Sequence, residues 1–114
     1  MDAEAQLLSL YEAFNARDID RVLAATTEDV DWPNGWEGGR ERGRAAVRAY
    51  WTRQWAEIDP HVEPVSIIRR PDGCVAVDVR QLVRDLDGNL LSDGHVVHVY
   101  EFRDGLVVRM DIEA

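Results

Sequence analysis

The chain contains no lysine, only one cysteine and no long apolar run. Its 13 basic side chains are therefore all arginine, and 22 acidic side chains bring the formal net charge to −9. Because an acidic domain repels phosphate backbones, nucleic acid is not an expected partner. The lone Cys74 cannot form a disulfide within the chain, which favours a reducing compartment.

No apolar run approaches the roughly 20 residues that a membrane helix needs, so no membrane contact is expected. The first residues lack the basic region of a secretory signal, which makes a cytoplasmic location the expectation. Three dispersed histidines and one cysteine give no recognisable metal spacing, and we expect neither a metal nor another cofactor. The length predicts a single domain over residues 1–114.

The first half of the sequence has helical periodicity. Residues 2–16 place Leu7, Tyr11 and Phe14 at helical spacing and predict a first helix. Asp18 is suited to cap a short second helix that ends near Thr26. A third helix is predicted to open at Gly43 and end at Pro60, with an apolar stripe of Val47, Tyr50, Trp51, Trp55 and Ile58.

The second half alternates apolar and polar residues, as half-buried strands do. Four Asp-Gly dipeptides interrupt it, and Asp-Gly between such runs favours tight hairpin turns. The predicted strands are 62–70, 74–86, 89 or 96 to 102, and 106–112, after an earlier candidate at 30–32 that Pro33 stops. Asp93-Gly94 lies inside the third of these runs and marks either a bulge or the start of a shorter strand. The pattern predicts an α+β domain in which helices cover one curved antiparallel sheet.

The two-residue period of a strand also assigns side chains to faces. We expect the inner face to carry Val75, Val77, Val79, Val83, His98, Tyr100, Phe102, Val108, Met110 and Ile112. We expect the convex outer face to carry Asp78, Arg80, His95, Val97, Val99, Glu101, Arg109 and Asp111. This outer set mixes charges with aliphatic surface and suits a second subunit.

A cluster of arginines precedes and opens the third predicted helix. Its members are Arg40, Arg42, Arg44 and Arg48, and Glu37 and Glu41 lie among them. We interpret the cluster as a solvated surface whose charges compensate one another.

Four segments in order along the chain, 11–20, 28–33, 43–51 and 100–108, resemble the SnoaL-like branch of the nuclear transport factor 2-like superfamily. The resemblance implies a cone-shaped barrel, with N-terminal helices packed in the concave face of a strongly curved antiparallel sheet. It also implies a homodimer through the sheet's outer face. It does not imply one reaction, because the superfamily includes ketosteroid isomerases, polyketide cyclases, dehydratases, epoxide hydrolases and members that only bind.

Two enzyme patterns of that superfamily fit poorly. Ketosteroid isomerases place an Asp directly before a Pro in the first strand, whereas here Trp32 precedes Pro33 and Asp31 stands one residue earlier. That single step reverses the side-chain direction. The epoxide hydrolase pattern needs an Arg between two acids, and Asp78, Arg80 and Asp111 fall on the predicted outer face, where an ion pair is the simpler interpretation.

His98 and Tyr100 form the best polar pair of the predicted interior. A histidine can take a proton near neutral pH, and a neutral phenol can donate to an oxyanion. The catalytic candidates are therefore His98 or Asp31 as base and Tyr100 as donor, the alternative for His98 being a hydrogen-bonded core histidine. The predicted pocket residues are Tyr11, Phe14, Trp32, Trp36, Tyr50, Trp51, Trp55, Val77, Val79, Phe102, Met110 and Ile112.

The sequence thus predicts a pocket for a small, apolar, ring-containing organic molecule. One hypothesis is cofactor-free proton transfer by an isomerase, cyclase or dehydratase. The other is a ligand-binding or dimeric assembly module without chemistry.

Overall fold

Local sequence signals set the limits of the helices and strands. The computed structural model describes residues 2–113. Asp2 and Asp18 cap the first two helices by accepting hydrogen bonds from backbone N–H groups three residues on. The elements are α1 (Ala3–Asn15), α2 (Ile19–Ala24), β1 (Thr26–Pro33), β2 (Arg40–Arg42), α3 (Arg44–Glu57), β3 (Ile58–Arg69), β4 (Val75–Asp85), β5 (Leu90–Arg103) and β6 (Leu106–Glu113).

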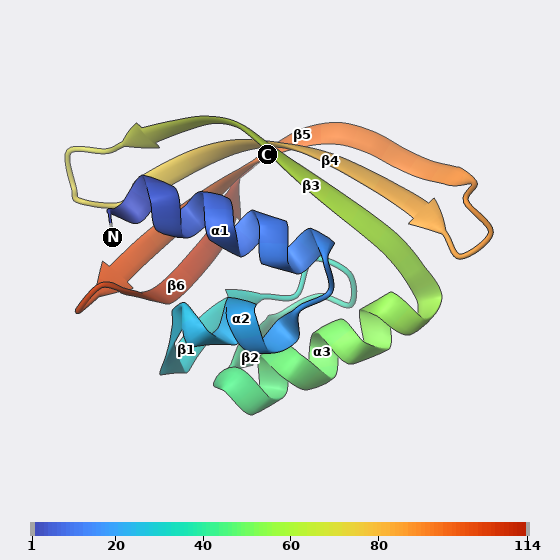
Figure 1. Cartoon of the computed structure of the whole chain (residues 1–114), viewed down its shortest axis with the longest axis horizontal. Helices are drawn as coiled ribbons and strands as arrows, with labels where there is room; N and C mark the ends of the chain where they lie inside the picture. The colour runs from blue at the N-terminus through green and yellow to red at the C-terminus, as the bar shows by residue number, and fades with distance from the viewer. Residues whose placement is uncertain (1, 114) are drawn as a thin grey trace.

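The strands form one six-stranded sheet in the order β2-β1-β6-β5-β4-β3. Every neighbouring pair is antiparallel except β1 and β6, which run parallel. Strands β3, β4 and β5 arch over α1, while α2 and α3 lie beside β1 and β2 (Figure 1). The predicted α+β architecture, with helices in the concavity of a curled sheet, is confirmed.

Three of the four Asp-Gly dipeptides make the hairpin turns. Gly73, Gly88 and Gly105 connect successive strands from β3 to β6 with φ angles of 90°, 91° and 81°, a region that glycine reaches without strain. The fourth dipeptide lies within β5, and its register with β4 is regular. The irregularity falls instead at Leu91, because Val83 pairs with Ser92 while Arg84 pairs with Leu90.

Two local predictions were wrong. No strand was predicted at Arg40–Arg42, where β2 pairs with β1. Helix α3 ends at Glu57 rather than at Pro60, and β3 begins directly at Ile58, whose backbone is extended. Pro60 is tolerated in this strand because β3 is the edge of the sheet, where a missing N–H costs no ladder bond.

The inner face of the sheet supplies most of the core. Val77, Val79 and Tyr100 are completely buried, as the alternation in β4 and β5 predicted. Trp51 on α3 is 2% exposed, and its ring contacts those of Phe14, Trp32 and Trp55. The tryptophans of α3 therefore pack mainly as core.

The prediction for β6 was wrong at one position. Val108 was assigned to the inner face, but Val107 is the buried residue, at 1% exposure. The register explains the difference, because Phe102 pairs with Val107 while Glu101 pairs with Arg109, which leaves Val108 as the extra residue of a bulge. The alternation changes phase there and returns Met110 to the core.

Replacing Val107 with Ala should destabilise the fold by about 2 kcal/mol, since two methyl groups leave a fully packed site. Val108→Ala is the matched control and should cost less than about 1 kcal/mol. Urea unfolding of both variants measures the difference. Equal losses would contradict the bulge.

Candidate functional site

A cavity of about 540 Å³ lies between the helical layer and the inner face of the sheet. Its walls are mostly apolar and aromatic, with polar groups from α3, the β1–β2 loop, β2, β4, β5 and β6. The lining residues are Phe14, Pro33, Asn34, Gly35, Trp36, Arg40, Tyr50, Trp51, Gln54, Ile58, Pro60, Val62, Gln81, Val83, Ser92, Val96, His98, Asp111 and Ile112. A second space of about 40 Å³ lies deeper, against Leu10, Tyr11, Phe14, Trp32, Val62, His98 and Tyr100.

The predicted pocket residues divide into three groups. Those that line the large cavity are Phe14, Trp36, Tyr50, Trp51 and Ile112. Tyr11 and Trp32 line the small space, together with Phe14. The rest, Trp55, Val77, Val79, Phe102 and Met110, belong to the core or pack against it and line neither space. Contact of any of these residues with a ligand stays a prediction.

His98 lies at the junction of the two spaces and lines both. It is 8% exposed, and its Nδ1 atom lies 2.8 Å from the hydroxyl of Tyr11 on α1. That hydroxyl lies 2.8 Å from the hydroxyl of Tyr100, which is two residues from His98 on β5. A buried chain of three polar side chains therefore connects the sheet to the first helix.

Burial shifts the titration of all three groups. Desolvation lowers the pKa of His98 to about 4, because the imidazolium would lose its hydration. It raises the pKa of Tyr11 and of Tyr100, because a phenolate would lose its hydration likewise. At neutral pH this hydrogen-bonded chain of side chains therefore consists of one neutral imidazole and two neutral phenols.

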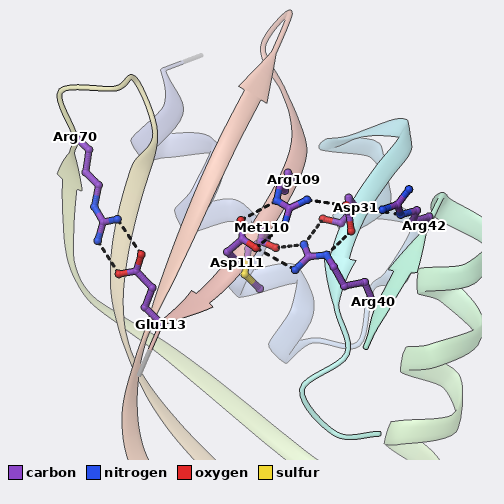
Figure 2. Close-up of polar contacts among 8 residues, drawn as sticks. All are labelled: Asp31, Arg40, Arg42, Arg70, Arg109, Met110, Asp111 and Glu113. Carbon is purple, nitrogen blue, oxygen red and sulfur yellow. Dashed lines mark hydrogen bonds and ion pairs between the residues drawn. The ribbon is translucent and has the colours of Figure 1, made fainter. Parts of the chain in front are cut away.

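Asp31 lies on the other side of β1 from Val30 and Trp32, which are buried in the core. Its carboxylate accepts from Arg40 Nε and, at 2.9 Å, from Arg109 Nη1, and Arg42 lies 3.9 Å away. Figure 2 shows these side chains meeting at the β2, β1 and β6 edge of the sheet. Asp31 as a base stays a prediction.

The same polar cluster reaches the cavity at two residues. Arg40 is bonded to Asp31, to the carbonyl of Met110 and, at 3.0 Å, to Asp111 (Figure 2). Arg40 and Asp111 both line the large cavity. Arg109 donates two hydrogen bonds to Asp111, at 2.9 and 3.0 Å, and thereby lowers the pKa of that carboxyl.

Three other predicted outer-face residues, Asp78, Arg80 and His95, have side-chain partners across strands. Arg80 lies 3.1 Å from Asp93, and His95 lies 3.4 Å from Asp78. Both contacts are exposed, and the one between Arg80 and Asp93 agrees with the ion-pair interpretation. Within residues 2–113, no three His, Cys, Asp or Glu side chains gather as a metal site, and no helix is long and apolar enough to cross a membrane.

Several polar lining residues were not predicted from the sequence. Gln81 lies between Val79 and Val83 at two-residue spacing along β4. The strand period places all three side chains on one face and could have predicted that Gln81 lies inside. Gln54 follows Tyr50 and Trp51 at helical spacing and donates to the Tyr50 hydroxyl at 3.3 Å. No local sequence signal predicts that Arg40 lines the cavity, because its partners on β6 are 70 and 71 residues away in the sequence.

Comparison with known families gives the class of this fold. The SnoaL-like domain family matches residues 7–110, which is most of the chain. The chain therefore belongs to the SnoaL-like domain family, as the four resembling segments indicated.

Solved structures agree on the fold. TerC, co-crystallised with polyporic acid, is 27% identical, with a TM-score of 0.82 over 95% of this chain and 87% of that chain. A protein of unknown function from Burkholderia pseudomallei, described as NTF2-like, is 26% identical, with a TM-score of 0.84 over 96% and 88% of the two chains. A Mycobacterium tuberculosis protein in complex with estradiol-17beta-hemisuccinate is 20% identical, with a TM-score of 0.80 over 95% and 89%, and shows the fold alone. No curated protein sequence matches this chain.

Replacing Arg109 with Gln should raise the pKa of Asp111 toward its ordinary value, because the largest stabilising contact of the carboxylate is lost. A lowered native pKa stabilises the fold above the unfolded value of about 4, and this contribution disappears as pH falls through the native value. The variant should therefore lose stability at neutral pH and depend less on pH in acid. Carboxyl NMR titration measures the pKa directly.

Arg70→Gln is the matched control for this change. Arg70 binds Glu113 at 2.9 and 3.0 Å and stands apart from the Asp31 cluster (Figure 2). The control should raise the pKa of Glu113 and leave the Asp111 titration little changed. An Asp111 carboxyl that titrates identically with and without Arg109 would refute the assignment.

Proposed function

We propose that this protein binds a small, largely apolar, ring-containing organic molecule in the cavity between its helices and sheet. The observation that carries the proposal is the cavity itself, whose volume of about 540 Å³ falls within the usual size of small-molecule sites. Phe14, Trp36 and Trp51 offer flat apolar walls, while Gln81 and His98 offer polar contacts. TerC, which shares the fold at 27% identity, was co-crystallised with polyporic acid, and this supports an organic ligand here.

Binding without chemistry is favoured over proton abstraction by the state of the titratable groups. His98 has a pKa of about 4, and the carboxyl of Asp111 is held by two arginines, so both are weak bases at neutral pH. The Tyr100 hydroxyl is bonded to Tyr11 and faces the small space rather than the large one. These contacts support the ligand-binding hypothesis of the sequence.

Cofactor-free proton transfer is the second candidate, as an isomerase, cyclase or dehydratase. One observation favours it, namely that a neutral imidazole backed by two buried phenols lies at the cavity wall. A neutral imidazole can polarise a ligand carbonyl by donating a hydrogen bond. In such a reaction His98 would act on the carbonyl, and the proton acceptor would come from Asp31, Asp111 or the ligand itself.

Filling the cavity mouth should block binding. Ser92→Phe adds a ring to a lining residue of β5, whereas Ser66→Phe adds the same ring to an exposed residue of β3 that does not line the cavity. Titration with α-tetralone, followed by the indole N–H NMR signals of Trp36 and Trp51, should give an affinity at least about tenfold weaker for Ser92→Phe. Ser66→Phe should bind like the wild type, and equal binding by both variants would exclude the cavity.

We also propose a homodimer through the convex outer face. Val97 and Val99 are only half-exposed there, beside the charged residues Glu101 and Arg109. An apolar strip flanked by charges of both signs suits a two-fold interface, because each charge finds its opposite on the second copy.

Light scattering should report about 26 kDa for the wild type, twice the chain mass of 13.0 kDa. Val99→Arg should shift the protein to the single-chain mass, because two like charges would meet across the symmetry axis. Leu8→Arg, at an exposed position of α1, should leave the mass unchanged. A wild-type protein that stays at 13.0 kDa at micromolar concentration would exclude the dimer.

A further inference from the structure

The direction of the buried hydrogen-bond chain follows from counting donors and acceptors. Tyr100 is completely buried, and in the part of the chain that the structure describes its hydroxyl bonds to the Tyr11 hydroxyl alone. A buried hydroxyl that does not donate leaves an unpaired proton in apolar surroundings, which is costly. The Tyr100 hydroxyl therefore donates a hydrogen bond to the Tyr11 oxygen.

The next bond follows from the first. The Tyr11 oxygen accepts the hydrogen bond from Tyr100, and the Tyr11 O–H group is left to donate one hydrogen bond of its own. Its second partner is His98 Nδ1, 2.8 Å away. Tyr11 therefore donates to Nδ1, which accepts and carries no proton.

The opposite direction leaves one group unpaired. If His98 Nδ1 donated to Tyr11, the two hydroxyls would share one remaining hydrogen bond, and the hydrogen of either Tyr11 or Tyr100 would have no acceptor among residues 2–113. Burial keeps the imidazole neutral at neutral pH, with a pKa of about 4, so it carries a single proton. That proton is then on Nε2.

Nε2 has access to open space. Within residues 2–113 the buried side-chain atoms without a hydrogen-bond partner are Thr27 Oγ1 and Trp55 Nε1. His98 bonds within the protein through Nδ1, and Nε2 is absent from this buried set, so Nε2 reaches space that is not filled by protein. The two spaces that His98 lines are the large cavity and the small one beside it.

We propose that His98 presents a fixed Nε2–H donor to the cavity, and that the protein thereby selects ring compounds whose inserted edge carries a hydrogen-bond acceptor oxygen, such as a ketone. This inference rests on the proposed binding function and names its ligand class. A ligand with only an N–H donor at that edge would meet another donor, and a hydrocarbon would leave the Nε2–H unpaired. Sites built to pair a polar group discriminate strongly against such analogues.

Tyr11 is the positioning residue of this arrangement. It does not reach the large cavity, but it sets which imidazole nitrogen is protonated. Tyr11 therefore determines the ligand preference of a residue on β5 without itself lining the large cavity.

The first experiment measures the tautomer in the ligand-free wild type. Proton–nitrogen correlation NMR of the imidazole ring at neutral pH distinguishes a protonated from an unprotonated ring nitrogen. We expect His98 Nε2 protonated and Nδ1 unprotonated. Tyr11→Phe should lose this preference, while Ser9→Ala, which removes an α1 hydroxyl bonded to Arg21 and lining neither space, should keep it. A wild-type spectrum with Nδ1 protonated would overturn the proposal whether or not any variant folds.

The second experiment compares three bicyclic probes of similar shape. α-Tetralone carries an acceptor oxygen, tetralin carries none, and tetrahydroquinoline carries an N–H donor. NMR titration of the wild-type protein should give tetralone the highest affinity, by about tenfold over each of the other two. Tyr11→Phe should reduce this difference, and Ser9→Ala should retain it.

The outcomes separate the two proposals. Equal binding of all three probes would overturn the acceptor preference and leave the cavity as an apolar binding site. Failure of all three to bind would overturn the proposed function together with the preference. Tetralone selectivity that survives Tyr11→Phe with an unchanged tautomer would remove the positioning role of Tyr11.

Discussion

The alternation of side chains along β5 is the constraint on which the interior depends. Val77 and Val79 of β4 are completely buried opposite His98 and Val96. A shift of one residue would turn every inner side chain outward, and Tyr100 would lose both its burial and its bond to Tyr11. The register is therefore fixed by burial and by the hydroxyl chain together, and both the cavity and the core follow from it.

Most of the fold was predictable from the sequence, because turns and strand faces depend on patterns of only a few residues. The Asp-Gly turns and the valine alternation predicted β4, β5 and their inner faces. The prediction failed where pairing with another strand decides which residues are paired. The bulge at Val108 depends on how β6 pairs with β5, and β2 exists only because β1 lies beside it. Three residues from Arg40 to Arg42 contain no signal of such pairing, since their polar side chains suit a loop equally well.

Two residues of the candidate site were predictable from the sequence, but their chemical roles were not. His98 and Tyr100 share a face of one strand, so two-residue spacing identified them together. Their chemistry depends on Tyr11, which is 87 residues from His98 and 89 from Tyr100. Strand periodicity contains no information about a proton donated across that separation. This is why the sequence suggested a histidine base, whereas the hydrogen bonds favour a histidine donor.

The distribution of charge explains why the donor is neutral. Asp31 and Asp111 are balanced by Arg40 and Arg109 at the edge of the sheet, and the formal net charge of −9 comes from surface residues. The single step from Asp31 to Trp32 puts an indole ring toward the core and the carboxylate toward the arginines. An imidazole buried without a carboxylate partner has nothing to stabilise its charged form. Burial therefore keeps His98 neutral, and a neutral histidine held by a tyrosine offers the cavity an N–H rather than a lone pair.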